Sequence, residues 1–569
     1  MLSRLTVNMS NGIITKEPFA LASSLGGRGL VSHILTTEID PALDPLSPGN
    51  MLILCTGLLA GTAVSTAGRL SIGAKSPLTG TIKESNVGGT AGFALSRHGI
   101  RLVTLTGATK PASQILVINA DGEASLQDAS SLRGLTTYQT VDALLKEYGD
   151  KNTILCVGPA GEHGYRTASV MVTDMDNHPS RAAGRGGMGL VMANKGLKAI
   201  VISKEGKYRT KPAHADDFKK AMGKYVQLLQ TNPMTSQVFP NFGTAALVGV
   251  VQEVGALPTK NFSVGAFEKV NGLLVETMET LQKERSGQMT HACQPGCIVK
   301  CSNVYHDRKG KYLTSGLEYE TIALNGSNLG IDDFDIVASI DRLCDEVGMD
   351  TMEFGATIGV AMETGLLTFG DGEGALKLIE EMRLGTPLGK ELGQGTERYG
   401  KSKGAKRIPT VKGQALAAYD PRGLKGTGVT YATSPMGADH TCGNTLGDPS
   451  VDPHLPKGQA ALSGMAQGGC AMLDCLGLCL FAGMALPPPD GPQVVAELLE
   501  ALYGESWTGE KVFGLGLETL GRERTFNKTA GFTLADDDLP AFMRTEPLAP
   551  HNSVFDVPKE EMEEHCTSV

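Results

Sequence analysis

The chain has 569 residues, of which 41% are hydrophobic and 20% charged, with a net charge of −10 at pH 7. This length is too great for one domain and predicts roughly three or four. The acidic balance argues against nucleic acid or an anionic membrane as the main partner, and eleven cysteines in a chain of this size do not indicate a secreted disulfide framework.

The N-terminal residues and the apolar runs predict the cellular location of the protein. Residues 1–7 lack the apolar core of a signal peptide. No apolar run approaches the ~18–20 residues that cross a bilayer. Residues 52–64 are interrupted by glycine and threonine, and residues 476–486 run into prolines. We therefore expect no membrane span and a reducing cytoplasm as the location.

Residues 1–208 are predicted to form a β-rich domain with glycine turns. Apolar, β-branched runs indicate strands at Met51–Cys55, Arg101–Thr106, Gln114–Ile118, Thr153–Val157 and Ala199–Ile202. Glycine clusters at 26–29, 86–89 and 184–187 separate such runs. Glycine makes up 72 of the 569 residues, which favours tight turns and close backbone approaches to a large cofactor.

The rest of the chain is predicted to be mainly helical, in two domains at 209–400 and 401–569. Apolar residues recur at helical spacing in Ala213–Thr231 and Phe334–Glu346. Residues 401–407 are basic and suit a surface connection, Gln459–Met484 is a glycine-rich helical stretch, and Leu539–Val557 is an extended tail. The predicted fold class is α+β.

Three cysteines, Cys293, Cys297 and Cys301, stand four residues apart. A local turn can bring their thiolates onto one surface, which is typical of a metal site. A cuboidal iron–sulfur cluster needs a fourth ligand, and the best candidate is Cys479. Two other interpretations stay open: a zinc site, and a radical-SAM enzyme, whose motif has a shorter second gap than the one present here.

A six-residue phrase occurs twice, as Asp345-Glu-Val-Gly348-Met-Asp350 and as Asp474-Cys-Leu-Gly477-Leu478-Cys479. The two copies suggest two similar sites related by pseudo-symmetry. A carboxylate accepts hydrogen bonds from an amino-bearing heterocycle, and a glycine lets the backbone approach a flat ligand. The alternative is chance, because Asp-x-x-Gly is frequent at helix ends.

Further phrases follow one another along the whole chain. They are Gly27–Leu30, Ala67–Arg69, Lys75–Gly80, Asn86–Gly89, Arg181–Gly189, Asn194–Ile200, Gly316–Thr321, Ala417–Gly423 and Ala432–His440. With the cysteines and the repeated phrase, in this order, they resemble the aldehyde ferredoxin oxidoreductase family, the tungsten-pterin enzymes of anaerobes.

The resemblance implies a base of two twisted β-sheets with near two-fold symmetry, formed by residues 1–208. Two pterins would lie on this base, enclosed by the two helical domains, and their dithiolene sulfurs would hold tungsten or molybdenum without a protein ligand. A magnesium ion would join the pterin phosphates through the backbone carbonyls of Asn86 and Ala182. The other implied cofactor contacts are Arg69, Gly88, Arg181, Asp345, Gly348, Asp350, Asp474, Gly477 and Leu478.

By the same resemblance, Cys293, Cys297, Cys301 and Cys479 would hold one [4Fe–4S] cluster, and Arg69 would bridge it to a pterin. Cys470 and Cys475 are expected only to pack. The acid–base groups would be Glu320 and His440, in an active site that also includes Tyr319. Glu318 competes with Glu320 for the role of the carboxylate.

The implied activity is oxidation of aldehydes to carboxylic acids, or the reverse, with electrons passed to ferredoxin or to a small iron–sulfur subunit. Alternatives are a related subunit that reduces aromatic thioesters, and a non-catalytic electron-transfer subunit. The first cysteine gap is one residue longer than in the best-known members. No histidine lies between His306 and His440, so the Glu/His iron bridge that joins subunits in some members is not expected, and the oligomeric state stays open.

Overall fold

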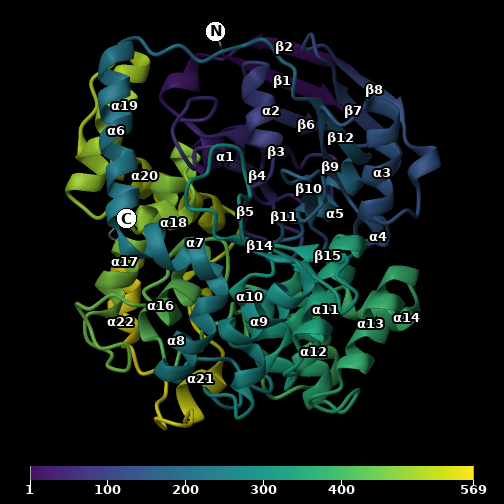
Figure 1. Ribbon diagram of the computed structural model, residues 1–569, viewed down its shortest axis with the longest axis vertical. Coiled ribbons are helices and arrows are strands. Elements are labelled where there is room, and N and C mark those ends of the chain that lie inside the picture. Colours follow the sequence, from purple (N-terminus) through teal and green to yellow (C-terminus); the bar gives the residue numbers. More distant parts are fainter. Residues whose placement is uncertain (1, 568–569) are drawn as a thin grey trace.

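The computed structural model describes residues 2–567, with the side chains of residues 2–564. Two six-stranded sheets form the N-terminal part, shown in purple and blue at the upper right of Figure 1, and mainly helical parts lie to its left and below. This arrangement confirms the predicted α+β fold class.

The two sheets of the base domain have the same topology. The first contains β1 (Ser3–Asn8), β2 (Ile14–Pro18), β3 (Leu52–Thr56), β4 (Leu70–Lys75), β5 (Ile82–Val87) and β6 (Ile100–Thr106). The second contains β7 (Gln114–Ile118), β8 (Ala124–Asp128), β9 (Asn152–Cys156), β10 (Val170–Val172), β11 (Arg181–Ala183) and β12 (Leu197–Ser203). Their orders are β2-β1-β6-β3-β4-β5 and β8-β7-β12-β9-β10-β11. Each sheet has one parallel pair, β1 with β6 and β7 with β12, so the base has the expected internal symmetry.

Apolar composition explains why these strands form the core of the base. Every residue of β3 and of β12 is buried, as continuous apolar runs predict. The helices of the base are α1 (Gly27–Glu38), α2 (Ala91–Arg97), α3 (Thr137–Tyr148), α4 (Pro159–Glu162) and α5 (Met188–Lys195). A reciprocal pair of hydrogen bonds between Thr136 and Gln139 caps the start of α3. The five predicted strands end within two residues of the observed ones.

The remaining elements are mostly helices. They are α6 (Ala215–Thr231), α7 (Phe239–Phe242), α8 (Leu247–Val254), α9 (Val275–Arg285), α10 (Tyr319–Asn325), α11 (Phe334–Val347), α12 (Thr351–Glu363), α13 (Gly372–Leu384), α14 (Pro387–Leu392), α15 (Thr396–Lys403), α16 (Lys425–Thr433), α17 (Gln459–Leu476), α18 (Leu480–Gly483), α19 (Asp490–Tyr503), α20 (Gly509–Thr529), α21 (Ala541–Thr545) and α22 (Lys559–Thr567). A three-stranded sheet of β13 (Gln288–His291), β14 (Ser302–His306) and β15 (Tyr312–Ser315) surrounds the cysteine segment, and β16 (Thr410–Val411) pairs with β17 (Gln414–Ala415). The three-stranded sheet was not predicted.

The division of the helical region differs from the predicted one. Helix α6 follows the base in sequence, yet it packs along α19 at the left of Figure 1, because Phe218, Tyr225 and Leu229 join the apolar cluster of the C-terminal helices. The predicted boundary at 400/401 falls inside α15. Part of the tail predicted as extended forms α21.

The long helical stretch from residue 459 is also shorter than predicted. Helix α17 ends at Leu476, because Gly477 has φ +75°, and α18 begins only at Leu480. Across the described residues, no helix combines the length and the apolarity needed to cross a bilayer.

The second copy of the repeated phrase lies directly on the base, and glycine makes this contact possible. A Cβ atom at Gly57, just after β3, would lie 2.1 Å from the backbone nitrogen of Gly477. Gly57 in the first sheet corresponds to Gly158 in the second, where a Cβ would lie 2.3 Å from the carbonyl oxygen of Val347. Both phrases therefore need a glycine beneath them.

We expect Gly57→Ala to destabilise the protein by about 1–3 kcal/mol, because the backbone atoms that a methyl group would meet cannot rotate away. The matched control is Gly223→Ala in α6, where nothing lies within 4 Å of the added Cβ. There the change removes chain entropy and stabilises by roughly 0.5–1 kcal/mol. Thermal unfolding midpoints of the two variants measure this difference, and equal midpoints would contradict the docking.

Candidate active site

A large cavity lies where the base meets the helical domains. It encloses about 1260 Å³ of space that no protein atom occupies, including a part open to solvent. The predicted site residues that line it are Arg69, Asn86, Gly88, Arg181, Ala182, Cys293, Cys301, Glu318, Glu320, Asp345, Asp350 and Cys479. The predicted site residues that do not line it are Cys297, Tyr319, Gly348, His440, Asp474, Gly477 and Leu478.

The two sheets contribute equivalent positions to the cavity. Asn86 pairs with Ser71 across β5 and β4, and Ala182 pairs with Met171 across β11 and β10, so the two residues occupy the same register. Strands β5 and β11 also contact each other. The Arg69 guanidinium donates to the Asn86 side chain and, at 3.3 Å, to its backbone carbonyl.

The two copies of the repeated phrase dock on the base through equivalent hydrogen bonds. In each copy one backbone N–H of the base donates to the glycine carbonyl, and the last residue of the phrase donates back. The bonds are Arg69 N to Gly477 O (3.2 Å), Cys479 N to Thr66 O (3.1 Å), Ser169 N to Gly348 O (2.9 Å) and Asp350 N to Thr167 O (3.0 Å). The pseudo-symmetry suggested by the sequence is therefore present in the backbone.

The side chains of the two copies differ. The Asp345 carboxyl lines the cavity, and burial together with Asp341 raises its pKa well above the usual range. Asp474 instead forms an ion pair with Arg28 at 3.4 Å, and burial raises its pKa to about 6. Gly348 and Gly477 end helices α11 and α17 in the left-handed conformation, so the helix-end interpretation of the phrase also holds.

Arg181 is the clearest sign that the cavity suits an anionic ligand. Its side chain is buried, and its Nε and Nη2 atoms have no hydrogen-bond partner. Its Nη1 lies 3.8 Å from the Glu318 carboxylate. Buried donors without acceptors are costly, and a guanidinium offers a fork that matches phosphate oxygens. A phosphate-bearing group therefore fits the donors that face this space.

The four predicted cysteines come together beside Arg69. All four are buried and free. Burial, and then the nearby Cys293 and Cys479, raise the pKa of Cys297 to about 12. A Cβ at Gly88 would lie 3.2 Å from Arg69 Nη1 and 3.4 Å from Cys293 Sγ, so glycine lets the guanidinium and the thiol approach. Four thiols in one place form the donor set of an iron–sulfur cluster.

Cys470 and Cys475, which were expected only to pack, are buried. The Cys475 sulfur contacts the Thr519 hydroxyl at 3.3 Å, on the side of α17 that faces α20. Neither thiol lines the cavity.

Glu320 and His440 form a buried ion pair. His440 Nε2 lies 2.9 Å from Glu320 Oε1, which also accepts a hydrogen bond from the Tyr419 hydroxyl at 3.2 Å. Burial opposes both charges, but each partner outweighs it, so the pKa of Glu320 is lowered and that of His440 is raised. The pair therefore favours a charged carboxylate and a protonated imidazole, and Glu320 lines the cavity.

Asp439 supports the imidazole from the other side. Its carboxylate lies 3.7 Å from His440 Nδ1, an atom without a hydrogen-bond partner, and 2.9 Å from Lys83 Nζ. Burial alone would raise the pKa of Asp439, but Lys83 and Arg185 outweigh it and hold that pKa far below its ordinary value. A charged aspartate thus faces the protonated ring.

The neighbours of Glu320 are placed differently. The Glu318 carboxylate accepts from the Thr244 hydroxyl at 2.6 Å and lies beside Arg181, and burial raises its pKa. The Tyr319 hydroxyl donates to the Ala418 carbonyl at 2.5 Å, away from the cavity. Tyr319 therefore does not line the cavity, although the sequence analysis placed it in the active site.

Several residues around the site were not proposed from the sequence. Tyr419, Asp439 and Lys83 surround the Glu320–His440 pair, and Arg185 joins Asp350 at 3.3 Å. Sequence position could have pointed to three of them. Asp439 directly precedes His440, and Tyr419 and Arg185 lie in phrases that carry the family resemblance. Nothing in the sequence linked Lys83 to Asp439.

Comparisons with known proteins agree with this geometry. The family profile described as aldehyde ferredoxin oxidoreductase, N-terminal domain, matches residues 4–204, and the one for domains 2 and 3 matches residues 220–568. The tungsten-containing aldehyde ferredoxin oxidoreductase of Pyrococcus furiosus is 34% identical over 95% of this chain and 91% of its own length. The protein of the same name from Thermococcus kodakarensis is also 34% identical, over 96% and 91%.

Two more distant proteins are similar as well. The aliphatic sulfonate oxidoreductase, WOR-like subunit, of Pyrococcus furiosus is 28% identical over 73% of this chain and 70% of its own length. The solved active-site complex BamBC of benzoyl coenzyme A reductase aligns with a TM-score of 0.81 at 20% identity, over 100% of this chain and 93% of the other, which shows a shared fold. The chain belongs to the aldehyde ferredoxin oxidoreductase family and is an oxidoreductase.

Proposed function

We propose that this protein oxidises aldehydes to carboxylic acids, or runs the reverse reaction, and exchanges electrons with ferredoxin or a small iron–sulfur subunit. The observation that carries the proposal is the ionised Glu320–His440 pair on a cavity that also holds the unpaired Arg181 donors and the cysteine thiols. The relatives at 34% identity bear the name of this activity.

The cavity residues fit a tungsten bis-pterin, the group that the relatives' name and the family imply. Arg181 and Arg69 would hold its phosphates, and the carbonyls of Asn86 and Ala182 stand at equivalent positions for a magnesium ion. Asp345 and Asp350 would bind one pterin, and Asp474 with the backbone around Gly477 and Leu478 the other. When bound, the tungsten centre would supply the two-electron redox chemistry. The same dithiolene sulfurs of the two pterins could hold molybdenum instead of tungsten.

Cys293, Cys297, Cys301 and Cys479 would hold one [4Fe–4S] cluster. Such a cluster carries one electron at a time, whereas aldehyde oxidation releases two, so an external acceptor is needed. We propose the cytoplasm as the location, because the cluster would need thiols that are not paired in disulfides, and a reducing compartment keeps them so.

Glu320 and His440 would handle the protons of the reaction. Oxidation of an aldehyde takes its oxygen from water and releases two protons with two electrons. The Glu320 carboxylate at the cavity can accept a proton from the attacking water, and the imidazolium behind it stabilises the charge and can pass a proton on. The Tyr419 hydroxyl fixes the carboxylate by donating to Oε1. Glu318 is less suited, since Thr244 and Arg181 engage it.

The test is an anaerobic assay of purified protein with short and long aldehydes and ferredoxin or a dye as acceptor. We expect aldehyde-dependent reduction of the acceptor. Turnover of an aromatic thioester with no aldehyde turnover would instead favour the reductase alternative, for which the likeness to the benzoyl coenzyme A reductase complex concerns the fold alone.

A pH profile tests whether Asp439 helps to keep His440 protonated. Asp439→Asn removes a negative charge beside His440 and leaves Lys83 unpaired, and both changes disfavour the protonated ring. Since His440 must keep its proton, activity is lost as pH rises through its pKa, and the variant should lose activity at lower pH than the wild type. Asp448→Asn, an exposed change in the same loop, is the control. An unmoved alkaline limb would contradict this role of Asp439.

A further inference from the structure

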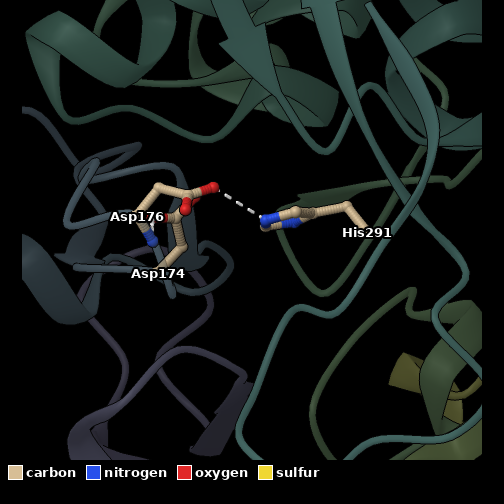
Figure 2. Close-up of side chains that lie close together, drawn as sticks. All are labelled: Asp174, Asp176 and His291. Carbon is tan, nitrogen blue, oxygen red and sulfur yellow. Dashed lines mark hydrogen bonds and ion pairs between the residues drawn. The ribbon is translucent and has the colours of Figure 1, made fainter.

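Three metal-ligating side chains meet outside the active-site cavity. Asp174 and Asp176 lie in the loop between β10 and β11, and His291 ends β13. Figure 2 shows the imidazole pointing toward the two carboxylates. One donor atom from each lies within 4.8 Å of the others, and Asp176 Oδ2 is 2.9 Å from His291 Nε2. Two elements far apart in sequence thus present two carboxylates and an imidazole to one point.

The Asp174 carboxylate is the second, independent sign of a cation. Its residue is fully buried, with 0% exposure. It accepts hydrogen bonds from the backbone N–H groups of Asp176 and His178, at 2.8 and 2.9 Å, and from the Ser180 hydroxyl at 2.9 Å. Within the described residues, no Lys, Arg or His nitrogen lies within 4.0 Å of it. A buried carboxylate is ordinarily paired with a cation; the Arg181 guanidinium acts on this one only through space, and no ion pair within 4.0 Å among the described residues neutralises it.

The other two ligands connect the site to solvent and determine which metal ions it favours. The His291 side chain is only 10% exposed and its Nδ1 has no partner, whereas the Asp176 side chain is 55% exposed. A metal can therefore enter past Asp176 and meet a largely buried imidazole. One nitrogen with two carboxylate oxygens suits borderline divalent metals such as zinc, iron and manganese rather than calcium.

We propose that Asp174, Asp176 and His291 bind one divalent transition-metal ion, which ties the base domain to the segment that carries the cysteines. His291 pairs with Cys301 in an isolated bridge, and Cys293, two residues after His291, accepts a hydrogen bond from Gly89 N at 2.8 Å. An ion at this point would fix the start of the cysteine segment against the loop that leads to Arg181. The proposal does not depend on the aldehyde chemistry.

Zinc is the probe for the test. Anaerobically purified holoprotein is dialysed against Zn²⁺, and zinc, iron and tungsten are counted per chain for the wild type, Asp176→Asn and His291→Gln. Asp174 is left unchanged, because its three hydrogen bonds shape the loop. Asp121→Asn, another exposed carboxylate of the base, is the matched control. We expect one zinc in the wild type and in the control that both site variants lack, with iron and tungsten unchanged in all four proteins.

Thermal unfolding gives a second readout, since an ion that binds only the folded state raises the midpoint. Zinc should raise the midpoint of the wild type and of Asp121→Asn, but not that of Asp176→Asn or His291→Gln. Equal zinc in the wild type and in His291→Gln, whether absent from both or bound to thiols in both, would overturn the proposal. So would the same zinc-dependent midpoint shift in all four proteins.

Discussion

Glu320→Gln is expected to lower the rate of aldehyde oxidation by about 10²- to 10⁴-fold, the range typical of a lost general acid–base group. The amide keeps the size of the side chain and its hydrogen bond with Tyr419, but it cannot accept a proton at neutral pH. It also removes the charge that holds His440 protonated. Tungsten and iron contents should not change, because Glu320 is neither one of the proposed pterin-binding residues nor one of the proposed cluster ligands. Steady-state rates with a good aldehyde substrate, measured on metal-replete protein, give the result.

Glu318→Gln is the matched control for this experiment. Its carboxylate is also at the cavity, two residues away, but it faces Arg181 and Thr244 rather than His440. We expect a much smaller loss of rate in this variant. Full activity in Glu320→Gln together with a large loss in Glu318→Gln would reverse the assignment of the catalytic carboxylate.

Cys479→Ala is expected to abolish or degrade the iron–sulfur cluster. A cuboidal cluster needs four ligands, and Cys479 is the one that lies outside residues 293–301. Its removal leaves three thiols on one loop, and the methyl group cannot bind iron. Iron per chain should fall. Ferredoxin-linked activity should fall with it, because the cluster that would transfer electrons to the acceptor is missing.

Cys475→Ala is the control here, since Cys475 lies four residues before Cys479, in the last turn of α17, yet contacts Thr519. This variant should retain its iron. Unchanged iron in Cys479→Ala would eliminate the fourth ligand, and iron loss in Cys475→Ala alone would transfer that role to Cys475.

Local patterns predicted much of this fold and brought the residues of the candidate site to attention. Continuous apolar runs located strands such as β3 and β12, because a strand buried on both faces is mostly apolar. Lys198 of β12 is the charged exception, and its buried charge is paired with Glu162. The repeated phrase indicated pseudo-symmetry, and the backbone shows it as equivalent hydrogen bonds around Gly348 and Gly477. Gly348 and Gly477 could be recognised because each occupies the same position in a repeated phrase.

Features that depend on packing between distant segments could not be predicted. Helix α6 follows the base in sequence, but its apolar stripe is matched by α19, and amphipathic spacing does not name a partner. Glu318, Tyr319 and Glu320 are consecutive, yet α10 begins at Tyr319, so successive side chains point in different directions and Tyr319 faces Ala418. The Lys83–Asp439 pair joins residues 356 positions apart, and no local motif contains both.

The most direct test of the central claim is a count of tungsten, molybdenum and iron per chain in anaerobically purified protein. We predict about one tungsten or molybdenum and about four irons per chain, the content of one metal-pterin centre with one cuboidal cluster. Iron without either heavier metal, or zinc at the cysteines in place of iron, would contradict the proposed aldehyde chemistry.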